Sequence, residues 1–270
     1  MQRFNPETDQ VLFDHVDGVV TLTLNRPDAR NALSDELTGA LRRGIAFAST
    51  APEVAVLVIS GSGKAFCAGG DVKAMGQRSD SVPSHEIQFK TMVQRHREIA
   101  GALQAMRKPT IASLPGAAAG AGMAIALACD MRVAADDAFL TTGYGRIGLP
   151  GDYGIAWLLT RVVGPARARE LMLTCDRVNA ARALELGLVN RIASPDSLQE
   201  ATMQLARQLT SGSPTAIAYM KDNLDEALLI SHDAAIEREA DRLLKARSTN
   251  DHKEAVKAFA EKREPKFTGS

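Results

Sequence analysis

A continuous apolar segment, residues 54–60 (VAVLVIS), constrains the fold of this chain more than any other stretch. Its β-branched residues predict a strand that is buried on both faces, as the strands of parallel sheets are. Residues 110–114 predict a second short buried strand, and residues 131–135 and 138–141 predict two more. Segments with helical periodicity separate these strands, and such alternation predicts a mainly parallel α/β fold.

Local signals mark several element ends. Two β-rich segments within residues 11–24 flank Asp17-Gly18, which predicts a hairpin. Ser34 precedes a helical stripe of apolar residues and is therefore predicted to be the N-cap of that helix. A long helix is predicted over residues 86–106. From residue 194 onward the chain is almost entirely helical in pattern. We therefore expect two parts, a core over residues 1–195 and a C-terminal helical region over residues 196–270 that packs on the core or on a neighbour.

Composition excludes several classes of function. The 270 residues carry 32 basic and 32 acidic side chains, so a nucleic acid or an anionic membrane surface is not an expected partner. The N-terminus lacks the apolar segment of a secretory signal, and the longest apolar stretch is too short to cross a bilayer. Widely spaced cysteines suggest free buried thiols in a reducing cytoplasm, with neither a zinc site nor a disulfide framework; they are Cys67, Cys129 and Cys175.

Two loops of small residues each follow a predicted buried strand: residues 64–71 (KAFCAGGD) and residues 115–122 (PGAAAGAG). Glycine lets a ligand approach the main chain, and the first amides of a helix point outward and attract negative charge. Two such amides that converge on one point would form an oxyanion hole. The alternative is that both loops are only tight turns that allow close packing. A phosphate-binding loop is excluded, because the first loop lacks a GKS or GKT ending and no GxGxxG opens a helix.

These loops belong to a longer series of motifs in a fixed order. The series comprises Asn25-Arg26-Pro27, Asn31-Ala32-Leu33, residues 61–71, Pro115-Gly116 through Gly120-Ala121-Gly122, Ala128-Cys129-Asp130, residues 161–164, Gly187-Leu188-Val189 and residues 259–263. Over almost its full length the chain resembles the enoyl-CoA hydratase/isomerase (crotonase) superfamily. The resemblance implies a spiral of ββα turns and a C-terminal helical region that forms a homotrimer, often as a dimer of trimers. It also implies an acyl-CoA thioester substrate, with coenzyme A as part of that substrate and no separate cofactor.

The resemblance also assigns site residues. It implies that the backbone amides of Gly70 and Ala121 form the oxyanion hole. The residues expected to contact coenzyme A are Arg30, Lys64, Ala65, Ala68 and Asp71 from one subunit, with Phe259 and Lys262 from a neighbouring subunit. Arg30 is a candidate phosphate contact, and its alternative is a solvated surface arginine. None of the five histidines has a carboxylate at ligand spacing, so no metal site is expected, and His96 is interpreted as a surface or internally satisfied residue.

The chain departs from the two-glutamate pattern of the hydratases. The resemblance places the two acids at Ala124 and Tyr144, where alanine carries no proton and tyrosine is a poor base near neutral pH. One carboxylate remains in this neighbourhood, Asp152. Family members with a carboxylate there include double-bond isomerases, among them the ring-opened epoxide type, as well as dienoyl isomerases and a haloaryl-CoA dehalogenase. The alternative is that Asp152 only caps the next helix.

We therefore predict enoyl-CoA double-bond isomerisation with Asp152 as the acid and base, and keep Tyr144 among the catalytic candidates. The alternatives that stay open are a hydratase with non-standard residues, a thioester hydrolase, a catalytically weak member that binds acyl-CoA, and a partner subunit of a complex. The acyl pocket is expected to draw on six apolar or aromatic residues, namely Met75, Phe89, Met92, Met123, Tyr144 and Trp157.

Overall fold

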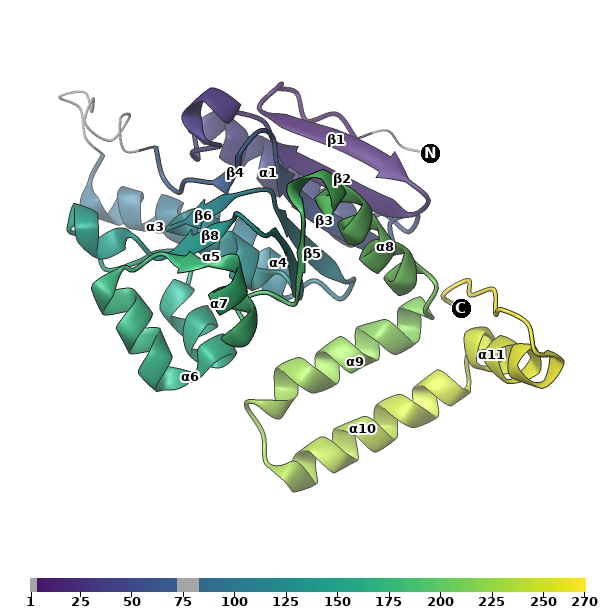
Figure 1. The fold of residues 1–270 in the computed structure, drawn as a ribbon. Helices are drawn as coiled ribbons and strands as arrows, with labels where there is room; N and C mark the ends of the chain where they lie inside the picture. Colours follow the sequence, from purple (N-terminus) through teal and green to yellow (C-terminus); the bar gives the residue numbers. More distant parts are fainter. Residues whose placement is uncertain (1–3, 72–82) are drawn as a thin grey trace.

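The structure, a computed structural model, describes residues 4–71 and 83–270 and contains two sheets (Figure 1). The larger sheet has the order β1-β2-β3-β5-β7-β10, and its strands are Val11–Val16, Val19–Leu24, Val56–Gly61, Thr110–Leu114, Met131–Ala135 and Arg191–Ala193. The smaller sheet has the order β4-β6-β8-β9, with strands Ala65–Cys67, Ala117–Ala119, Phe139–Thr141 and Val178–Asn179. Pairing is parallel except between β1 and β2 and between β8 and β9, so the predicted mainly parallel α/β arrangement is confirmed.

Successive segments climb through the two sheets in the same way. β3 and β4, β5 and β6, and β7 and β8 each contribute first to the larger sheet and then to the smaller one, and helical segments follow. The helices of this part are α1 (Asp35–Thr50), α3 (His85–His96), α4 (Ala102–Gln104), α5 (Ala121–Ala128), α6 (Ile155–Thr174) and α7 (Ala180–Glu185). Repetition of strand, strand and helix is the ββα spiral that the resemblance implied.

The N-terminal elements follow their local signals. Asp17 and Gly18 both have positive φ, as a tight two-residue hairpin turn requires, and they join β1 to β2. Ser34 is the N-cap of α1, where its hydroxyl accepts a hydrogen bond from the backbone N–H of Leu37 at 3.0 Å.

Two helical stretches are irregular. The helix expected over residues 86–106 is interrupted by a π-helical segment, Arg97–Gly101, between α3 and α4. Helix α6 consists of two helical parts that meet at a kink at Gly164 and Pro165. Proline removes a backbone donor and glycine adopts a φ of 77° there, so the helical path breaks within the element.

Helix α5 lies at the centre of the core, and all eight of its residues are buried. Its small side chains let the first loop approach closely. A Cβ on Gly122 would lie 2.3 Å from the carbonyl oxygen of Cys67, and a Cβ on Gly116 would lie 2.2 Å from that of Lys64. Glycine at these two positions therefore allows the first and second loops to pack backbone against backbone.

The C-terminal helices are α8 (Leu198–Thr210), α9 (Pro214–Ala227), α10 (His232–Arg247) and α11 (Asn250–Glu261). Helix α8 packs on the larger sheet, whereas α9 and α10 lie side by side and extend away from the core (Figure 1). Ion pairs anchor α9 to the core: Lys221 contacts Asp130 at 2.6 Å and Arg107 contacts Asp222 at 2.7 Å. Within the part of the chain that the structure describes, no helix has the length and apolar character to cross a membrane.

Candidate functional site

The first loop directs the amide of Gly70 away from the N-terminal part of the chain. The carbonyl oxygen of Gly69 accepts a hydrogen bond from the backbone N–H of Leu33 at 2.8 Å. That carbonyl and the N–H of Gly70 belong to one trans peptide and point in opposite directions. The N–H of Gly70 therefore faces away from Leu33. Gly69 makes this path possible with a φ of 92°, which other residues rarely adopt.

The second loop directs the amide of Ala121 out of the start of α5. The carbonyl oxygen of Gly120 accepts the helical bond from the N–H of Ala124 at 3.1 Å, so it points into the helix. The N–H of Ala121, in the same trans peptide, points the other way. The loops are neighbours, since a Cβ on Gly69 would lie 3.5 Å from the backbone nitrogen of Ala121.

Asp152 and Tyr144 are brought together beside the second loop. The Tyr144 hydroxyl donates a short hydrogen bond to Oδ1 of Asp152. Tyr144 begins the 3-10 helix η3 (Tyr144–Ile147), and Asp152 lies in the turn before α6. A Cβ on Gly120 would lie 3.8 Å from two atoms of the Tyr144 ring, so this ring lies against the loop that carries the Ala121 amide.

The Asp152 side chain contacts Tyr144 and does not cap α6. That helix begins at Ile155 with Gly154 as its N-cap and without a side-chain capping bond. Asp152 contributes only its carbonyl oxygen, which accepts from the N–H of Ile155 at 3.0 Å. The interpretation of Asp152 as a helix cap alone is therefore wrong, and its carboxylate faces Tyr144.

Burial dominates the electrostatics of the pair. Loss of water around the carboxylate raises the pKa of Asp152, while the Tyr144 hydrogen bond and the nearby His96 act in the opposite direction. Burial, and then the charge of Asp152, raise the pKa of Tyr144 well above its usual value. Tyr144 therefore stays a phenol and a hydrogen-bond donor, and Asp152, which has the lower ordinary pKa of the two, is the candidate proton acceptor.

Cys67, the cysteine of the first loop, is not activated. Its side chain is fully buried, and burial raises the pKa of the thiol to about 12. The backbone N–H of Gly69 donates to Sγ at 3.4 Å, which opposes this shift only in part. The thiol stays protonated at neutral pH, so Cys67 is not a thiolate nucleophile.

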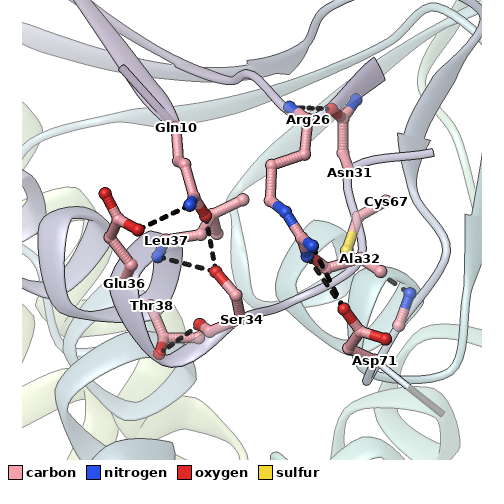
Figure 2. A network of polar contacts seen from close by, with 11 residues as sticks. Gln10, Arg26, Asn31, Ala32, Ser34, Glu36, Leu37, Thr38, Cys67 and Asp71 are labelled. Carbon is pink, nitrogen blue, oxygen red and sulfur yellow. Dashed lines mark hydrogen bonds and ion pairs between the residues drawn. The ribbon is translucent and has the colours of Figure 1, made fainter. Parts of the chain in front are cut away.

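Asn31 and Arg26 brace the first loop, as Figure 2 shows in part. The buried Asn31 amide donates to the carbonyl oxygens of Ser62 and Ala65 at 3.0 and 2.8 Å. Its oxygen accepts from the backbone N–H of Arg26 at 2.8 Å. The Arg26 guanidinium contacts the Asp71 carboxylate at 3.1 Å, so this carboxylate, expected at the coenzyme A site, contributes to the brace.

The other residues expected to contact coenzyme A from this subunit differ in exposure. Arg30, Lys64 and Ala68 are exposed, and the N–H of Ala68 donates to the carbonyl oxygen of Arg30 at 2.9 Å. The structure thus brings Arg30 beside the first loop. The Ala65 side chain is buried in β4, and its carbonyl oxygen is engaged by Asn31.

The structure does not bring Phe259 and Lys262 to the glycine loops of their own chain. Both lie on or just after α11, which packs on α10 and stands apart from the core in Figure 1. The Phe259 side chain is 87% exposed, which is unusual for an aromatic residue with no other role. Contact between these two residues and the site of a neighbouring subunit stays a prediction.

The residues predicted for the acyl pocket are divided. Met123 is buried in the core, whereas Phe89, Met92 and Trp157 are about half exposed. The ring of Trp157 lies under the guanidinium of Arg161, 3.5 Å from the ring centroid. Met75 lies outside the described residues.

Sequence reasoning missed two residues next to Asp152. His96, interpreted as a surface or satisfied histidine, is half-buried and packs against Tyr153, with ring centroids 4.1 Å apart and planes 37° apart. Tyr153 itself is 6% exposed. No local pattern marks either residue, because their contact depends on how α3 and the turn before α6 meet. Across the described ranges, no group of three or more His, Cys, Asp and Glu side chains is arranged to hold a metal ion.

Comparison with known families decides the chain's affiliation. The family model described as enoyl-CoA hydratase/isomerase matches residues 14–270. The chain belongs to the enoyl-CoA hydratase/isomerase family. A crystal structure of an enoyl-CoA hydratase from Polaromonas sp. JS666 matches with a TM-score of 0.89 at 33% identity, over 95% of this chain and 99% of that one. The crotonase fold predicted from the sequence is therefore confirmed.

The solved structure from Polaromonas is named a hydratase, whereas two relatives in the enoyl-CoA hydratase/isomerase family are named isomerases. A trans-2-decenoyl-[acyl-carrier-protein] isomerase of Streptococcus mutans is 33% identical over 96% of this chain and 98% of its own length. A 1,2-epoxyphenylacetyl-CoA isomerase of Escherichia coli is 33% identical over 96% of this chain and 99% of its own. Family membership thus shows an enzyme of the hydratase/isomerase type and implies an acyl-CoA thioester substrate, and the choice between the two reactions depends on the site.

Proposed function

We propose that this chain is an enoyl-CoA double-bond isomerase in which Asp152 is the acid and base. The observation that carries the proposal is the contact between the Tyr144 hydroxyl and the Asp152 carboxylate beside the amide of Ala121. A single carboxylate suffices for isomerisation, because the same group removes a proton at one carbon and returns it at another. The trans-2-decenoyl-[acyl-carrier-protein] isomerase among the relatives supports the same reaction class.

The proposed reaction begins with the thioester oxygen between the amides of Gly70 and Ala121. The Asp152 carboxylate removes a proton from C2 of a 3-enoyl thioester, and the C–H electron pair forms the C1–C2 double bond of a dienolate. Negative charge moves to the thioester oxygen, where two amide donors stabilise it. The protonated Asp152 then delivers the proton to C4, the C2–C3 double bond forms, and the thioester carbonyl is restored.

The environment of Asp152 suits this role. Burial raises the pKa of its carboxyl, and a base whose pKa lies nearer to the working pH transfers protons more effectively. Tyr144 keeps its proton and holds one carboxylate oxygen, so we assign it the task of orienting Asp152. The other carboxylate oxygen is the one proposed to face the substrate.

Absence of the second acid disfavours hydration. Addition of water is normally guided by two carboxylates, and Ala124 stands where the resemblance places the first. Ala124 is fully buried and carries no polar group, so it cannot orient a water molecule. Tyr144 stands at the position of the second glutamate of the hydratase pattern, and its hydroxyl already donates to Asp152.

The decisive experiment measures whether isotopes from labelled water enter the product. Wild-type protein is incubated with 3-hexenoyl-CoA and with crotonyl-CoA in ²H₂¹⁸O. Isomerisation by the single carboxylate yields 2-hexenoyl-CoA without ¹⁸O, in which C4 carries the protium taken from C2, with deuterium there only as far as the protonated Asp152 exchanges with solvent. Hydration yields a 3-hydroxyacyl-CoA that carries ¹⁸O. Release of free coenzyme A would indicate a thioester hydrolase, and tight binding without turnover would indicate a binding protein; each of these three results contradicts the proposal.

Asp152→Asn is the matching variant, because the amide keeps the shape of the side chain and cannot take up the proton. We expect kcat to fall by roughly 10²–10⁴-fold, the usual contribution of a general base. Asp196→Asn is the control, since Asp196 is exposed in the short helix η4 (Pro195–Ser197). Full activity in Asp152→Asn would exclude Asp152 as the base.

Substrate binding and assembly form the second part of the proposal. We propose that Arg30, Lys64 and Ala68 bind coenzyme A, with Phe259 and Lys262 of a neighbouring subunit in a homotrimer or a dimer of trimers. Exposed apolar side chains along the C-terminal helices support self-association; among them are Met220, Leu224, Leu228, Leu229, Leu243 and Leu244. A cytoplasmic location is part of the same proposal and agrees with the three free, buried cysteines.

A further inference from the structure

Two rings from distant parts of the chain meet next to Asp152. The imidazole of His96, at the last position of α3, packs on the ring of Tyr153 with centroids 4.1 Å apart. Tyr153 follows Asp152 directly in the chain, so this contact fixes one end of the turn that carries the carboxylate. The Tyr144 hydrogen bond holds the side chain of Asp152 itself. The backbone and the side chain of Asp152 are therefore held by different partners.

The turn around Asp152 has an uncommon backbone. Gly151, Tyr153 and Gly154 have φ values of 127°, 49° and 76°. Glycine adopts such angles freely, but a bulky residue with positive φ is an outlier that persists only when its surroundings hold it. The ring of Tyr153 is 6% exposed, and packing around that ring is what can hold the strained residue. The His96 imidazole is one wall of that packing.

Helix α3 also departs from regular geometry where it meets this turn. The π-helical segment Arg97–Gly101 begins immediately after His96. A π-helical turn inserts an extra residue into the helical path, so the side chains before it and after it are rotated relative to those of a regular helix, and such turns are frequent at functional sites. The irregularity therefore lies at the residue that touches Tyr153, and it shares that location with the strained backbone of the turn.

The groups that face His96 favour an uncharged ring. Burial lowers the pKa of the imidazole, Arg95 acts in the same direction, and the Asp152 carboxylate acts against both. Around Tyr153, the charged neighbours are Asp152, Arg95 and Arg42. Arg95 is engaged by Asp35 at 2.7 Å, and the Arg42 guanidinium by Glu98 at 2.7 Å. A neutral imidazole can stack on a phenol ring without taking a charge into this partly buried space.

We propose that His96 is a positioning residue for Asp152: its ring supports Tyr153, and through Tyr153 it holds the turn that aims the Asp152 carboxylate at the acyl group. The inference rests on the proposed role of Asp152 and extends it to a residue that does not touch the substrate. The aromatic ring is what the role requires, and a proton on the imidazole is not required. His96→Phe should therefore preserve the function that His96→Ala removes.

The test compares His96→Ala, His96→Phe and His85→Ala with the wild type. His85 is exposed at the first position of the same helix and serves as the matched control. We expect kcat for the 3-enoyl-CoA to fall about 10- to 100-fold in His96→Ala, the range that a misplaced catalytic group produces. KM should stay within about twofold of the wild type, because the residues proposed to bind coenzyme A do not lie on this turn. His96→Phe and His85→Ala should keep kcat within about threefold of the wild type.

Crystal structures of the variants supply a readout that does not depend on activity. We expect Asp152 to lose its contact with Tyr144 in His96→Ala and to keep it in His96→Phe. If wild-type protein turns over no unsaturated acyl-CoA, the proposed function fails, while a displaced Asp152 in His96→Ala still supports the positioning role. An unmoved Asp152 with unchanged kcat in His96→Ala overturns the role, and so does a His96→Phe variant as impaired as His96→Ala.

Discussion

The Tyr144 hydroxyl donates its hydrogen bond to the Asp152 carboxylate across eight residues that include a 3-10 turn and two glycines with positive φ. The donor keeps its proton because its pKa is raised, and the acceptor lies in a partly buried environment that raises its own pKa. Burial raises the pKa of Asp152, and the hydrogen bond from Tyr144 lowers it. The working pH range of the enzyme should therefore respond to either one.

Tyr144→Phe should move the acidic limb of the pH–kcat/KM profile to higher pH. The Tyr144 hydrogen bond lowers the pKa of Asp152, so its removal leaves burial less opposed and the pKa rises. Asp152 acts as a base only when ionised, so activity is lost as the pH falls through a pKa that is now higher. Steady-state rates between pH 5 and about 9 measure the shift.

Tyr219→Phe is the control for this variant, since Tyr219 lies on α9, where its ring packs under Arg107, 5.4 Å from the guanidinium carbon to the ring centroid. That change keeps the ring and should leave the profile unaltered. An acidic limb that stays in place, or moves to lower pH, in Tyr144→Phe would contradict the assigned role of the hydrogen bond.

Gly69→Ala should impair both stability and turnover. A Cβ at this position would lie 2.9 Å from the carbonyl oxygen of Ala119, and the φ of 92° is strained for alanine. Relief of the clash moves the peptide that carries the Gly70 amide, the proposed oxyanion-hole donor. Loss of one oxyanion-hole donor typically lowers kcat by about 10²–10³-fold. Chemical denaturation and kcat measure the two effects separately.

Gly187→Ala isolates the backbone cost, because Gly187 has a φ of 76° and open space around its added Cβ. It should lower the free energy of unfolding by about 1–2 kcal/mol, the cost of a left-handed conformation for alanine, and leave kcat unchanged. Equal kcat in the two glycine variants would show that the first loop does not contribute the proposed donor.

Much of the fold could be predicted because its signals are local. The apolar run that became β3, the turn residues Asp17 and Gly18, and the N-cap Ser34 each specify their element within a few positions. Strand β6 is the counterexample. Its three residues are all alanine, which favours strands little, and they become a strand because β4 and β8 pair with them on either side.

The same distinction applies to the site. The two loops could be predicted because glycine is needed wherever backbones approach closely, and Gly69 and Gly122 are examples. The polar contacts that hold the first loop could not be predicted. Arg26 and Asp71, for example, are 45 positions apart, and no local pattern connects them. The contact between His96 and Tyr153 is hidden for the same reason, and the π-helical segment that follows His96 has no recognised sequence signal.

Asn31→Ala should loosen the first loop. Asn31 is fully buried, and its amide makes three hydrogen bonds that join the Arg26 backbone to the carbonyl oxygens of Ser62 and Ala65. Alanine leaves those groups without this partner, which should lower the free energy of unfolding by about 2–5 kcal/mol. The KM for the acyl-CoA should rise as well, because the exposed residues proposed to bind coenzyme A lie on the braced segments.

Asn25→Ala is the control for the brace, since the Asn25 amide donates one bond, to the carbonyl oxygen of Asp9 at 2.8 Å, at the protein surface. A small loss of stability and an unchanged KM are expected, and both are measured by urea denaturation and steady-state kinetics. If the two asparagine variants lose equal stability, the Asn31 amide does not brace the loop.

Leu224→Asp combined with Leu228→Asp should dissociate the proposed oligomer. The two leucines are 70% and 65% exposed in the single chain, and an assembly that buries them gains apolar contact that a carboxylate would oppose. Light scattering after size exclusion should give three or six chains for the wild type and one chain for the double variant. Leu173→Asp is the control, because Leu173 is 81% exposed on α6 rather than on a C-terminal helix, and it should leave the mass unchanged. Dissociation should also raise the KM for the acyl-CoA, since Phe259 and Lys262 would no longer reach a neighbouring site. A wild-type protein that elutes as a monomer, with an ordinary KM, would exclude both the assembly and the contribution of α11 to the site.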